Sequence, residues 1–305
     1  MSVASAPPSD PPATHCAWCR AELPDEAPRA GGLARCARCG AATTDPWPSE
    51  ATLRRAYAGW YRPSEGRFAG PGDAILKRSR GALARRLDEI APPGPVLDVG
   101  AGDGTLLDAL RGQGREAIGL ELVSTRPDIK ATDIADLDQR DFAAIVFWHS
   151  LEHLPRPAEA LGRAAELLAP GGVLVIAAPN SDSLQARVFG ERWLALDLPR
   201  HLVHLPAKAL VGRLRELGLK VTRTSHLRGG QVVFGWLHGL VGALPTHPDL
   251  YDAIRRPQAR RERMTRGRRA ATLAAASALA PVALAASAAE AAARRGGSIY
   301  VEATR

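Results

Sequence analysis

The stretch Val96-Leu97-Asp98-Val99-Gly100-Ala101-Gly102-Asp103-Gly104 decides the fold of this 305-residue chain. Residues 96–99 form a short apolar run typical of a buried strand, and a helical pattern follows over 106–113. Glycine has no Cβ atom, so the backbone of the connecting turn can approach a bound ligand closely. The stretch therefore predicts a strand, a ligand-binding turn and a helix.

Two carboxylates flank this turn and limit what it can hold. Asp98 and Asp103 would repel a pyrophosphate, but they can attract the cationic amino acid group of S-adenosylmethionine. The spacing Gly100-x-Gly102-x-Gly104 also differs from the G-x-G-x-x-G fingerprint of dinucleotide sites. The turn therefore favours a sulfonium nucleoside over a dinucleotide.

Short apolar runs alternate with helical patterns on both sides of the turn. We expect strands over 117–121, 144–148, 173–178, 220–224 and 298–302, and helices over 50–57, 74–90, 157–168 and 207–217. This alternation predicts an α/β fold with a Rossmann-like, doubly wound, mostly parallel sheet. Glu121 ends the second of these strands about 20 residues after the turn, where an acid accepts hydrogen bonds from a ribose.

The motifs, in their order along the chain, resemble the class I S-adenosylmethionine-dependent methyltransferases. The resemblance is carried by VLDVGAGDG at 96–104, GLE at 119–121, TDI at 132–134, SLEHL at 150–154 and LAPGGVLVIAAPN at 168–180. It covers about residues 57–227 and the terminal strand. One departure is Phe142-Ala143-Ala144-Ile145, where the class often has an F-D-x-I pattern.

The resemblance implies a set of residues that bind S-adenosylmethionine. Gly100, Ala101 and Gly102 would contact its amino acid part, and Glu121 would bind its ribose. Asp133 and Ile134 would lie beside the adenine. Asp98 and Trp148 complete the expected cofactor-binding set.

One subgroup of the class, similar to types 11 and 23 and carrying an N-terminal four-cysteine zinc ribbon, is especially similar. Its linker pattern matches Pro46-Trp47-Pro48, Leu53, Tyr57 and Tyr61. A second matching stretch is Trp193 followed by Asp197-Leu198-Pro199-Arg200-His201-Leu202.

The expected catalytic residues are His149, His201 and Arg200. Methyl transfer needs in-line alignment and removal of one proton, so we expect a histidine general base after the fourth core strand. Arg200 would either hold an anionic acceptor by a forked contact or tie the Trp193 loop to the sheet.

The string His149-Ser150-Leu151-Glu152-His153 also matches the H-x-x-E-H pattern of some metalloproteases. We reject that interpretation because a strand precedes the string, and Pro155 and Pro157 follow it at once. A divalent ion held by His149, Glu152 and His153 remains an alternative.

The pairs Cys16-x-x-Cys19 and Cys36-x-x-Cys39 have sixteen residues between them. This spacing is typical of a zinc site in which four thiolates complete a closed tetrahedral shell. The pattern predicts a structural Zn²⁺, and free or disulfide-linked cysteines are the alternative.

The predicted organisation has five parts. Residues 1–14 form a disordered tail, 15–45 the zinc ribbon, and 46–93 linker helices that cap the active site. Residues 94–228 and 297–305 form the methyltransferase core. Residues 229–296 form a helical insertion before the last strand.

The insertion combines apolar and basic segments. Residues 232–244 are apolar, 255–269 hold an Arg cluster, and the uncharged run 271–289 is interrupted by Pro281. Because the last strand should rejoin the sheet, a single membrane span is excluded. The insertion is expected to be either a helical lid or an element on an anionic membrane surface.

A net charge of +8 suits an anionic partner without selecting one. The leading function is a cytoplasmic methyltransferase that acts on a small-molecule, lipid or sugar acceptor, and peripheral membrane contact through 229–296 is one of the two alternatives for the insertion. A nucleic-acid or protein methyltransferase is less favoured, since the basic run lacks interleaved aromatic residues. A non-catalytic cofactor-binding module is the third alternative. Oligomeric state and acceptor identity do not follow from the sequence.

Overall fold

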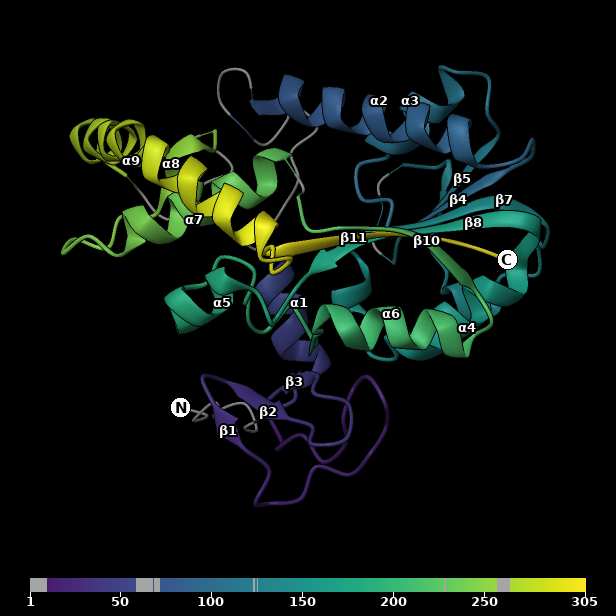
Figure 1. Cartoon of the computed structure of the whole chain (residues 1–305), viewed down its shortest axis with the longest axis horizontal. Coiled ribbons are helices and arrows are strands. Elements are labelled where there is room, and N and C mark those ends of the chain that lie inside the picture. The colour runs from purple at the N-terminus through teal and green to yellow at the C-terminus, as the bar shows by residue number, and fades with distance from the viewer. Residues whose placement is uncertain are drawn as a thin grey trace, which may run out of the picture.

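The computed structural model describes residues 10–58, 68, 72–122, 124, 126–227, 229–256 and 264–305. Within these ranges a seven-stranded sheet lies between layers of helices, with a small second sheet below it (Figure 1). Residues 1–9 of the expected tail, Tyr61, and residues 257–263 of the Arg cluster lie outside the described residues.

The strands are β1 (Arg29–Ala30), β2 (Leu33–Arg35), β3 (Ala42–Thr44), β4 (Val96–Val99), β5 (Ala117–Leu120), β6 (Ile129–Lys130), β7 (Phe142–Trp148), β8 (Leu168–Pro179), β9 (Val203–His204), β10 (Lys220–Ser225) and β11 (Ser298–Thr304). The α-helices are α1 (Glu50–Ala58), α2 (Gly72–Ile90), α3 (Thr105–Arg111), α4 (Pro157–Leu167), α5 (Leu184–Phe189), α6 (Ala207–Glu216), α7 (Gly229–Gly242), α8 (Leu250–Ile254) and α9 (Arg266–Ala292). Three short 3-10 helices are η1 (Ile134–Asp136), η2 (Leu151–His153) and η3 (Gly190–Arg192).

The large sheet has the strand order β10-β11-β8-β7-β4-β5-β6. The strands from β8 to β6 pair in parallel, whereas β11 pairs antiparallel with both β8 and β10. The predicted α/β class with a doubly wound, mostly parallel sheet is therefore confirmed. Parallel strands place their carboxyl ends at one edge, and ligands bind at that edge in such folds.

Each strand packs alternate residues on opposite faces of the sheet, and both faces are covered. This explains why β7 is apolar and buried without interruption from Phe142 to Phe147. One face packs on α4 and α6 through Leu97, Ile145, Phe147, Ile176, Leu161, Leu210 and Leu214. The other packs on α2 and α3 through Val96, Val146, Val175, Leu83, Leu87, Leu106 and Leu110.

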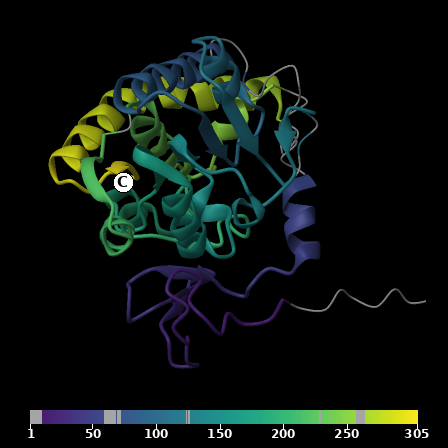
Figure 2. The same cartoon turned by 90° about the vertical axis from the view of Figure 1, so that its right-hand side faces the viewer.

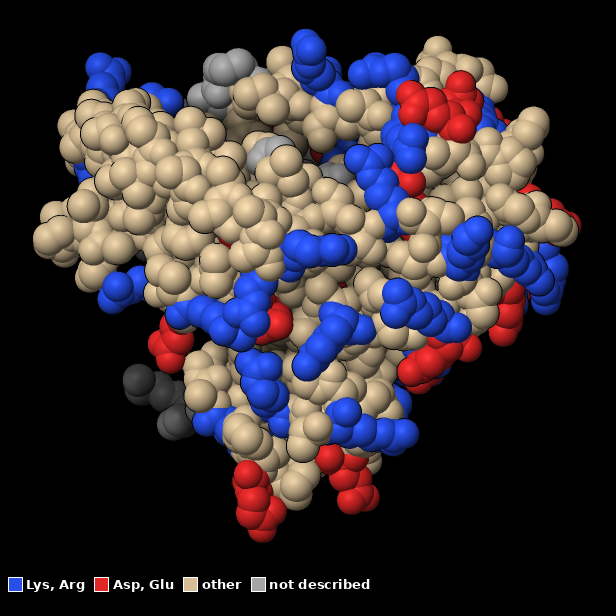
Figure 3. Space-filling view, viewed as in Figure 1, with Lys and Arg blue, Asp and Glu red and all other residues tan. Residues whose placement is uncertain are grey.

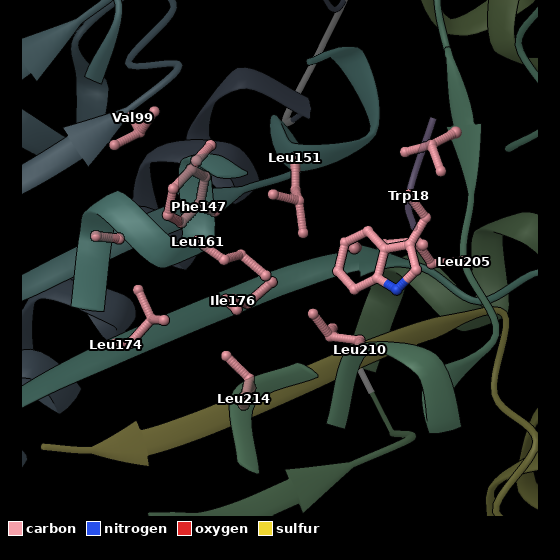
Figure 4. Close-up of a cluster of buried hydrophobic side chains, with 14 of the residues drawn as sticks. Trp18, Val99, Phe147, Leu151, Leu161, Leu174, Ile176, Leu205, Leu210 and Leu214 are labelled. Carbon is pink, nitrogen blue, oxygen red and sulfur yellow. The ribbon is translucent and has the colours of Figure 1, made fainter. Parts of the chain in front are cut away.

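The small sheet joins the N-terminal segment to the part of the chain that forms the large sheet. Its order is β1-β2-β3-β9, and β9 comes from the core side of the chain. Trp18 is 5% exposed and belongs to the same buried cluster as Leu205 and Leu210 (Figure 4). The two parts therefore share one hydrophobic core, and Figure 2 shows the N-terminal sheet directly beneath the large one.

The insertion of α7, α8 and α9 lies between the end of β10 and the start of β11. Since β10 runs parallel to β8, the insertion emerges at the same edge as the glycine turn. Glu290 of α9 is fully buried and accepts hydrogen bonds from Gln185 of α5 and Trp236 of α7. This contact fastens the insertion to the core.

Pro281 lies inside α9, which is one continuous helix from Arg266 to Ala292. Pro281 lies on the exposed side of α9, where water can satisfy the carbonyl group that loses its donor. By length and composition α9 could cross a bilayer, and only 22% of its most apolar window is buried. However, β11 pairs with β8 from Ser298 onward, so the chain returns to the large sheet shortly after α9 ends.

Candidate active site

The glycine turn is pinned between the ends of three strands. The backbone amides of Gly100 and Ala101 donate to the Leu120 carbonyl at the end of β5, over 2.8 and 2.9 Å. Gly100 has a φ of 82°, and a Cβ atom there would lie 2.3 Å from Cβ of Ser150. Only glycine fits this position, because both the backbone conformation and the close neighbour exclude a side chain.

Glu121 and the turn meet at the carboxyl edge. Glu121 directly follows β5, and its Oε2 accepts a hydrogen bond from the Gly102 amide over 3.0 Å. A carboxylate at this point can accept hydrogen bonds from ribose hydroxyls. The structure thus brings the acid and the turn together, which is the arrangement that S-adenosylmethionine needs.

The other expected cofactor residues surround this edge. Asp98 is buried in β4, and Asp133 caps η1 by accepting from the Ala135 amide over 2.9 Å. Ile134 is buried beside it. Trp148 ends β7, and the guanidinium of Arg80 lies 4.9 Å from the centre of its ring. Their roles in cofactor binding stay predictions.

A group of five side chains lies where η2 meets the loop before β9, and we call it the histidine–carboxylate cluster: His149, Glu152, His153, Asp197 and His201. Glu152 is 3% exposed, with Oε1 3.4 Å from Nδ1 of His149 and 4.0 Å from Nε2 of His201. Nε2 of His201 also lies 3.7 Å from Oδ2 of Asp197. Ser150 touches the glycine turn, so the cluster adjoins the expected cofactor site.

Backbone carbonyls set the tautomers of two of these histidines. Nδ1 of His153 lies 3.0 Å from the Arg200 carbonyl, and Nδ1 of His201 lies 2.8 Å from the Ala195 carbonyl. A carbonyl only accepts, so in both rings Nδ1 carries the hydrogen. In each neutral ring Nε2 therefore carries the lone pair.

The cluster holds an ionised carboxylate and a neutral imidazole. Burial opposes ionisation of Glu152, but the neighbouring histidines, His149 foremost, outweigh it and lower the pKa of Glu152 to about 2. Burial lowers the pKa of His153 to about 4, and His201 adds to this effect. At neutral pH the cluster thus holds a charged Glu152 carboxylate beside a neutral His153 imidazole.

The buried side chain of Arg200 contacts the same loop that carries it, the loop that follows Trp193. Its guanidinium pairs with Asp197, and its side chain is 5% exposed. This contact is the one expected if Arg200 fastens the Trp193 loop. A role of Arg200 toward an anionic acceptor stays a prediction, as do the catalytic roles of His149 and His201.

Tyr57, Asp197 and His204 join this site although sequence reasoning did not assign them to it. The Tyr57 hydroxyl lies 3.1 Å from Nδ1 of His153, and Nε2 of His204 lies 3.2 Å from Oγ1 of Thr44. Tyr57 and Asp197 belong to patterns that the sequence did show, the linker and the D-L-P-R-H stretch. Those patterns carried no indication that their side chains would meet.

The four cysteines converge on one point. The sulfur atoms of Cys16 and Cys39 are 3.6 Å apart, as are those of Cys19 and Cys36. A tetrahedral zinc ion with bonds of about 2.3 Å separates its sulfur ligands by roughly 3.8 Å. All four thiols are free in the structure, and the cluster fits a structural zinc site.

A cleft with a volume of about 650 Å³ opens beside the cluster. Its walls come from the turn at Gly31 and Gly32, from the loop 191–198, and from His238, Asp249 and Tyr251 of the insertion. Asp197 belongs both to this wall and to the histidine–carboxylate cluster. The cleft and the cluster therefore meet at Asp197.

Comparison with known proteins agrees with this geometry. Residues 75–224 match the family model described as a methyltransferase domain. Together with the sheet order and the glycine turn, this match shows that the chain belongs to the class I S-adenosylmethionine-dependent methyltransferases.

Relatives with assigned roles are distant. The ubiquinone biosynthesis O-methyltransferase of Alkalilimnicola ehrlichii is 29% identical over 125 residues, which are 34% of this chain and 50% of that protein. The protein of the same name from Xylella fastidiosa strain 9a5c is 29% identical over 171 residues, 47% of this chain and 70% of that one. The chain spans 50% to 60% of the length of the first curated relatives. A solved methyltransferase from Archaeoglobus fulgidus covers 74% of this chain and 94% of its own, at 15% identity and a TM-score of 0.44.

Proposed function

We propose that this protein transfers the methyl group of S-adenosylmethionine to an oxygen atom of a small-molecule, lipid or glycan-linked acceptor. The observation that carries the proposal is the meeting of the glycine turn with Glu121 at the carboxyl edge of the sheet. The choice of oxygen is supported by the name of the relatives, which are O-methyltransferases.

The cofactor, when bound, supplies a methyl group already activated on a sulfonium. The turn at Gly100–Gly102 would hold its amino acid part, with Asp98 nearby, and Glu121 would hold its ribose. The cleft would admit the acceptor, with the insertion and the N-terminal sheet as its walls. These contacts contribute by aligning the two reactants and excluding water.

We propose His149 as the group that takes up the acceptor's proton. Glu152 lies 3.4 Å from its Nδ1 and would hold the ring with a hydrogen at that nitrogen. Nε2 of His149 would then carry the lone pair needed for a general base. Nε2 of His201 lies beside two carboxylates, Glu152 and Asp197, so we do not assign the general base to His201.

Binding of the demethylated cofactor, S-adenosylhomocysteine, tests the core of the proposal. Titration calorimetry on the whole protein should show binding, and Glu121→Ala should weaken it about tenfold or more through loss of hydrogen bonds to a charged group. Glu116→Ala, an exposed change of the same charge at the other end of β5, is the matched control and should bind as the natural chain does. Absence of binding by the natural chain to both forms of the cofactor would refute the assignment.

We also propose that the four cysteines hold Zn²⁺ and that the protein is cytoplasmic, with the insertion resting on an anionic membrane surface. Support for the membrane contact comes from α9, which exposes Val282 and Leu284 at 52% and 57%. Figure 3 shows few charged side chains over α9 except at its margins. Arg266 and Arg268 lie exposed at the start of the helix, where they can face lipid phosphates.

Sedimentation with vesicles tests the membrane contact. The natural chain should bind vesicles that contain anionic lipid at low salt, and Val282→Glu with Leu284→Glu should bind far less. Neutral vesicles are the control for the charge. Equal binding by the double variant, or none by the natural chain, would exclude this role for α9.

A further inference from the structure

We propose that Glu152, His153 and His201 form a binding site for a first-row divalent transition-metal ion, separate from the four-cysteine cluster. The ligand atoms of these three side chains all lie within 4.8 Å of one another. They come from η2 and from the loop before β9, segments that the backbone bond from the Leu202 amide to the Glu152 carbonyl joins over 2.8 Å. His201 thus takes the place that the sequence suggested for His149.

The two imidazoles are already oriented as metal ligands. Each donates its Nδ1 hydrogen to a backbone carbonyl, Arg200 for His153 and Ala195 for His201. A ligating histidine usually donates its other ring nitrogen in this way, which fixes the ring and its tautomer. The free Nε2 lone pairs belong to rings whose centres are 4.6 Å apart.

The Glu152 carboxylate, which lies beside both imidazoles, accepts no hydrogen bond from the described part of the chain. Among the described residues, neither oxygen of Glu152 has a hydrogen-bond partner, although the side chain is 3% exposed. The nearest donor, Nδ1 of His149, is 3.4 Å away. A buried carboxylate that accepts no hydrogen bond is costly. A cation held between the three side chains would offset this cost.

The donor set indicates which ion fits. Two imidazole nitrogens and one carboxylate oxygen suit Zn²⁺, Mn²⁺ or Fe²⁺, whereas Mg²⁺ and Ca²⁺ prefer oxygen ligands alone. Asp197, with Oδ2 3.7 Å from Nε2 of His201, stands next to the site and also lines the cleft. The ion would therefore keep open positions toward the cleft. If the proposed methyl transfer is right, an acceptor oxygen would bind there and become easier to deprotonate.

Metal content separates this site from the cysteine cluster. Full-length protein produced and purified with Zn²⁺ present, then freed of loosely bound metal by gel filtration, should hold two equivalents by elemental analysis. Glu152→Gln and His201→Asn should each hold one, the equivalent at the cysteines. Glu159→Gln, an exposed change on α4 that leaves the cluster intact, should still hold two.

Manganese provides a second and independent readout. Mn²⁺ has little affinity for thiolate sites, so binding detected by electron paramagnetic resonance reports on the histidine–carboxylate site. The natural chain should reduce the signal of free Mn²⁺, and the two site variants should not. A natural chain that binds one zinc equivalent and no Mn²⁺ overturns the proposal whether or not the variants fold.

The same preparations separate this proposal from the proposed function. Calorimetry with S-adenosylhomocysteine on the natural chain reports cofactor binding apart from metal content. Cofactor binding with a single metal equivalent would refute only the second metal site. Two equivalents without cofactor binding would refute only the methyltransferase assignment.

Discussion

At the scale of single residues, the site depends on positions that tolerate neither an added side-chain atom nor a lost charge. Gly100 is the clearest case, because its left-handed φ and its contact with Ser150 both exclude a Cβ atom. Glu152 is another, because its charge is buried among histidines. Both residues lie at the carboxyl edge of the sheet.

Gly100→Ala should destabilise the protein by about 1 to 3 kcal/mol and abolish cofactor binding, because the added Cβ strains the turn and pushes on Ser150. Urea unfolding and calorimetry measure the two effects. Gly114→Ala is the control, since Gly114 has a φ of 79° but no atom near the added Cβ. If both variants lose cofactor binding equally, the contact with Ser150 is not the reason.

His204 makes stability depend on pH. Burial lowers its pKa to about 3, whereas a histidine in an unfolded chain titrates at about 6.5. Between these values the unfolded chain binds more protons, so the free energy of unfolding falls as the pH drops. From about pH 7.5 to about pH 5.5 this one group should cost on the order of 1 kcal/mol.

The test compares unfolding of the natural chain and His204→Asn at both pH values. The variant should lose about 1 kcal/mol less than the natural chain over this range. His247→Asn, a change at an exposed histidine, should keep the full dependence. An identical pH dependence in all three proteins would argue against a buried neutral His204.

At the scale of elements, the insertion is held by one buried carboxylate. Glu290 of α9 accepts from the Gln185 amide and its Nε2 over 2.9 Å each, and from Nε1 of Trp236 over 2.8 Å. Its partners come from two other helices, α5 and α7, so this residue sets how α7 and α9 pack on α5. Because α9 is continuous through Pro281, fixing Glu290 also fixes the position of the rest of the helix.

Glu290→Ala should destabilise the protein by on the order of 3 kcal/mol, because three buried donors lose their acceptor. Trp236→Phe removes one donor and should cost less. Hydrogen exchange should show faster opening of α7 and α9 in both variants, while β4 and β7 stay protected. Equal exchange in the natural chain and Glu290→Ala would mean that the carboxylate does not fasten the insertion.

At the scale of the whole molecule, the N-terminal sheet is part of the core and also a wall of the cleft. β3 pairs with β9, and Trp18 packs in the cluster that includes Leu205 and Leu210. Any metal held by the cysteines therefore supports more than the N-terminal segment. Its loss would expose apolar surface of the methyltransferase core.

Cys36→Ser should lower the unfolding temperature of the entire protein in a single calorimetric transition, because the two parts share one core. Glu152→Gln is the control for the second metal site and should leave the cysteine-bound metal in place. The total tryptophan fluorescence should shift to longer wavelength in the cysteine variant, because buried Trp18 would become exposed. Two separate transitions, with the core unaffected, would show that the N-terminal segment folds alone.

The strands and main helices could be predicted from sequence because their signals are local. The apolar run Val96–Val99, followed directly by glycines, indicates a strand from its local pattern. The glycine turn together with Glu121 indicates a ligand site at the sheet edge. Short elements such as β6, β9 and α5 carried no such signal. β9 has only two residues, and it exists because β3 lies beside it.

The sequence by itself determined the class of the protein: the order of strands, the cofactor turn with its acid, and the cysteine pairs. These features are set by residues close together along the chain. Only the tertiary structure decided that His201 meets Glu152 and His153, that Arg200 pairs within its own loop, and that the N-terminal sheet shares the core. The meeting of His201 with Glu152 and the shared core join segments tens of residues apart, and they form because hydrophobic burial folds the loops onto the sheet edge, which no local pattern records.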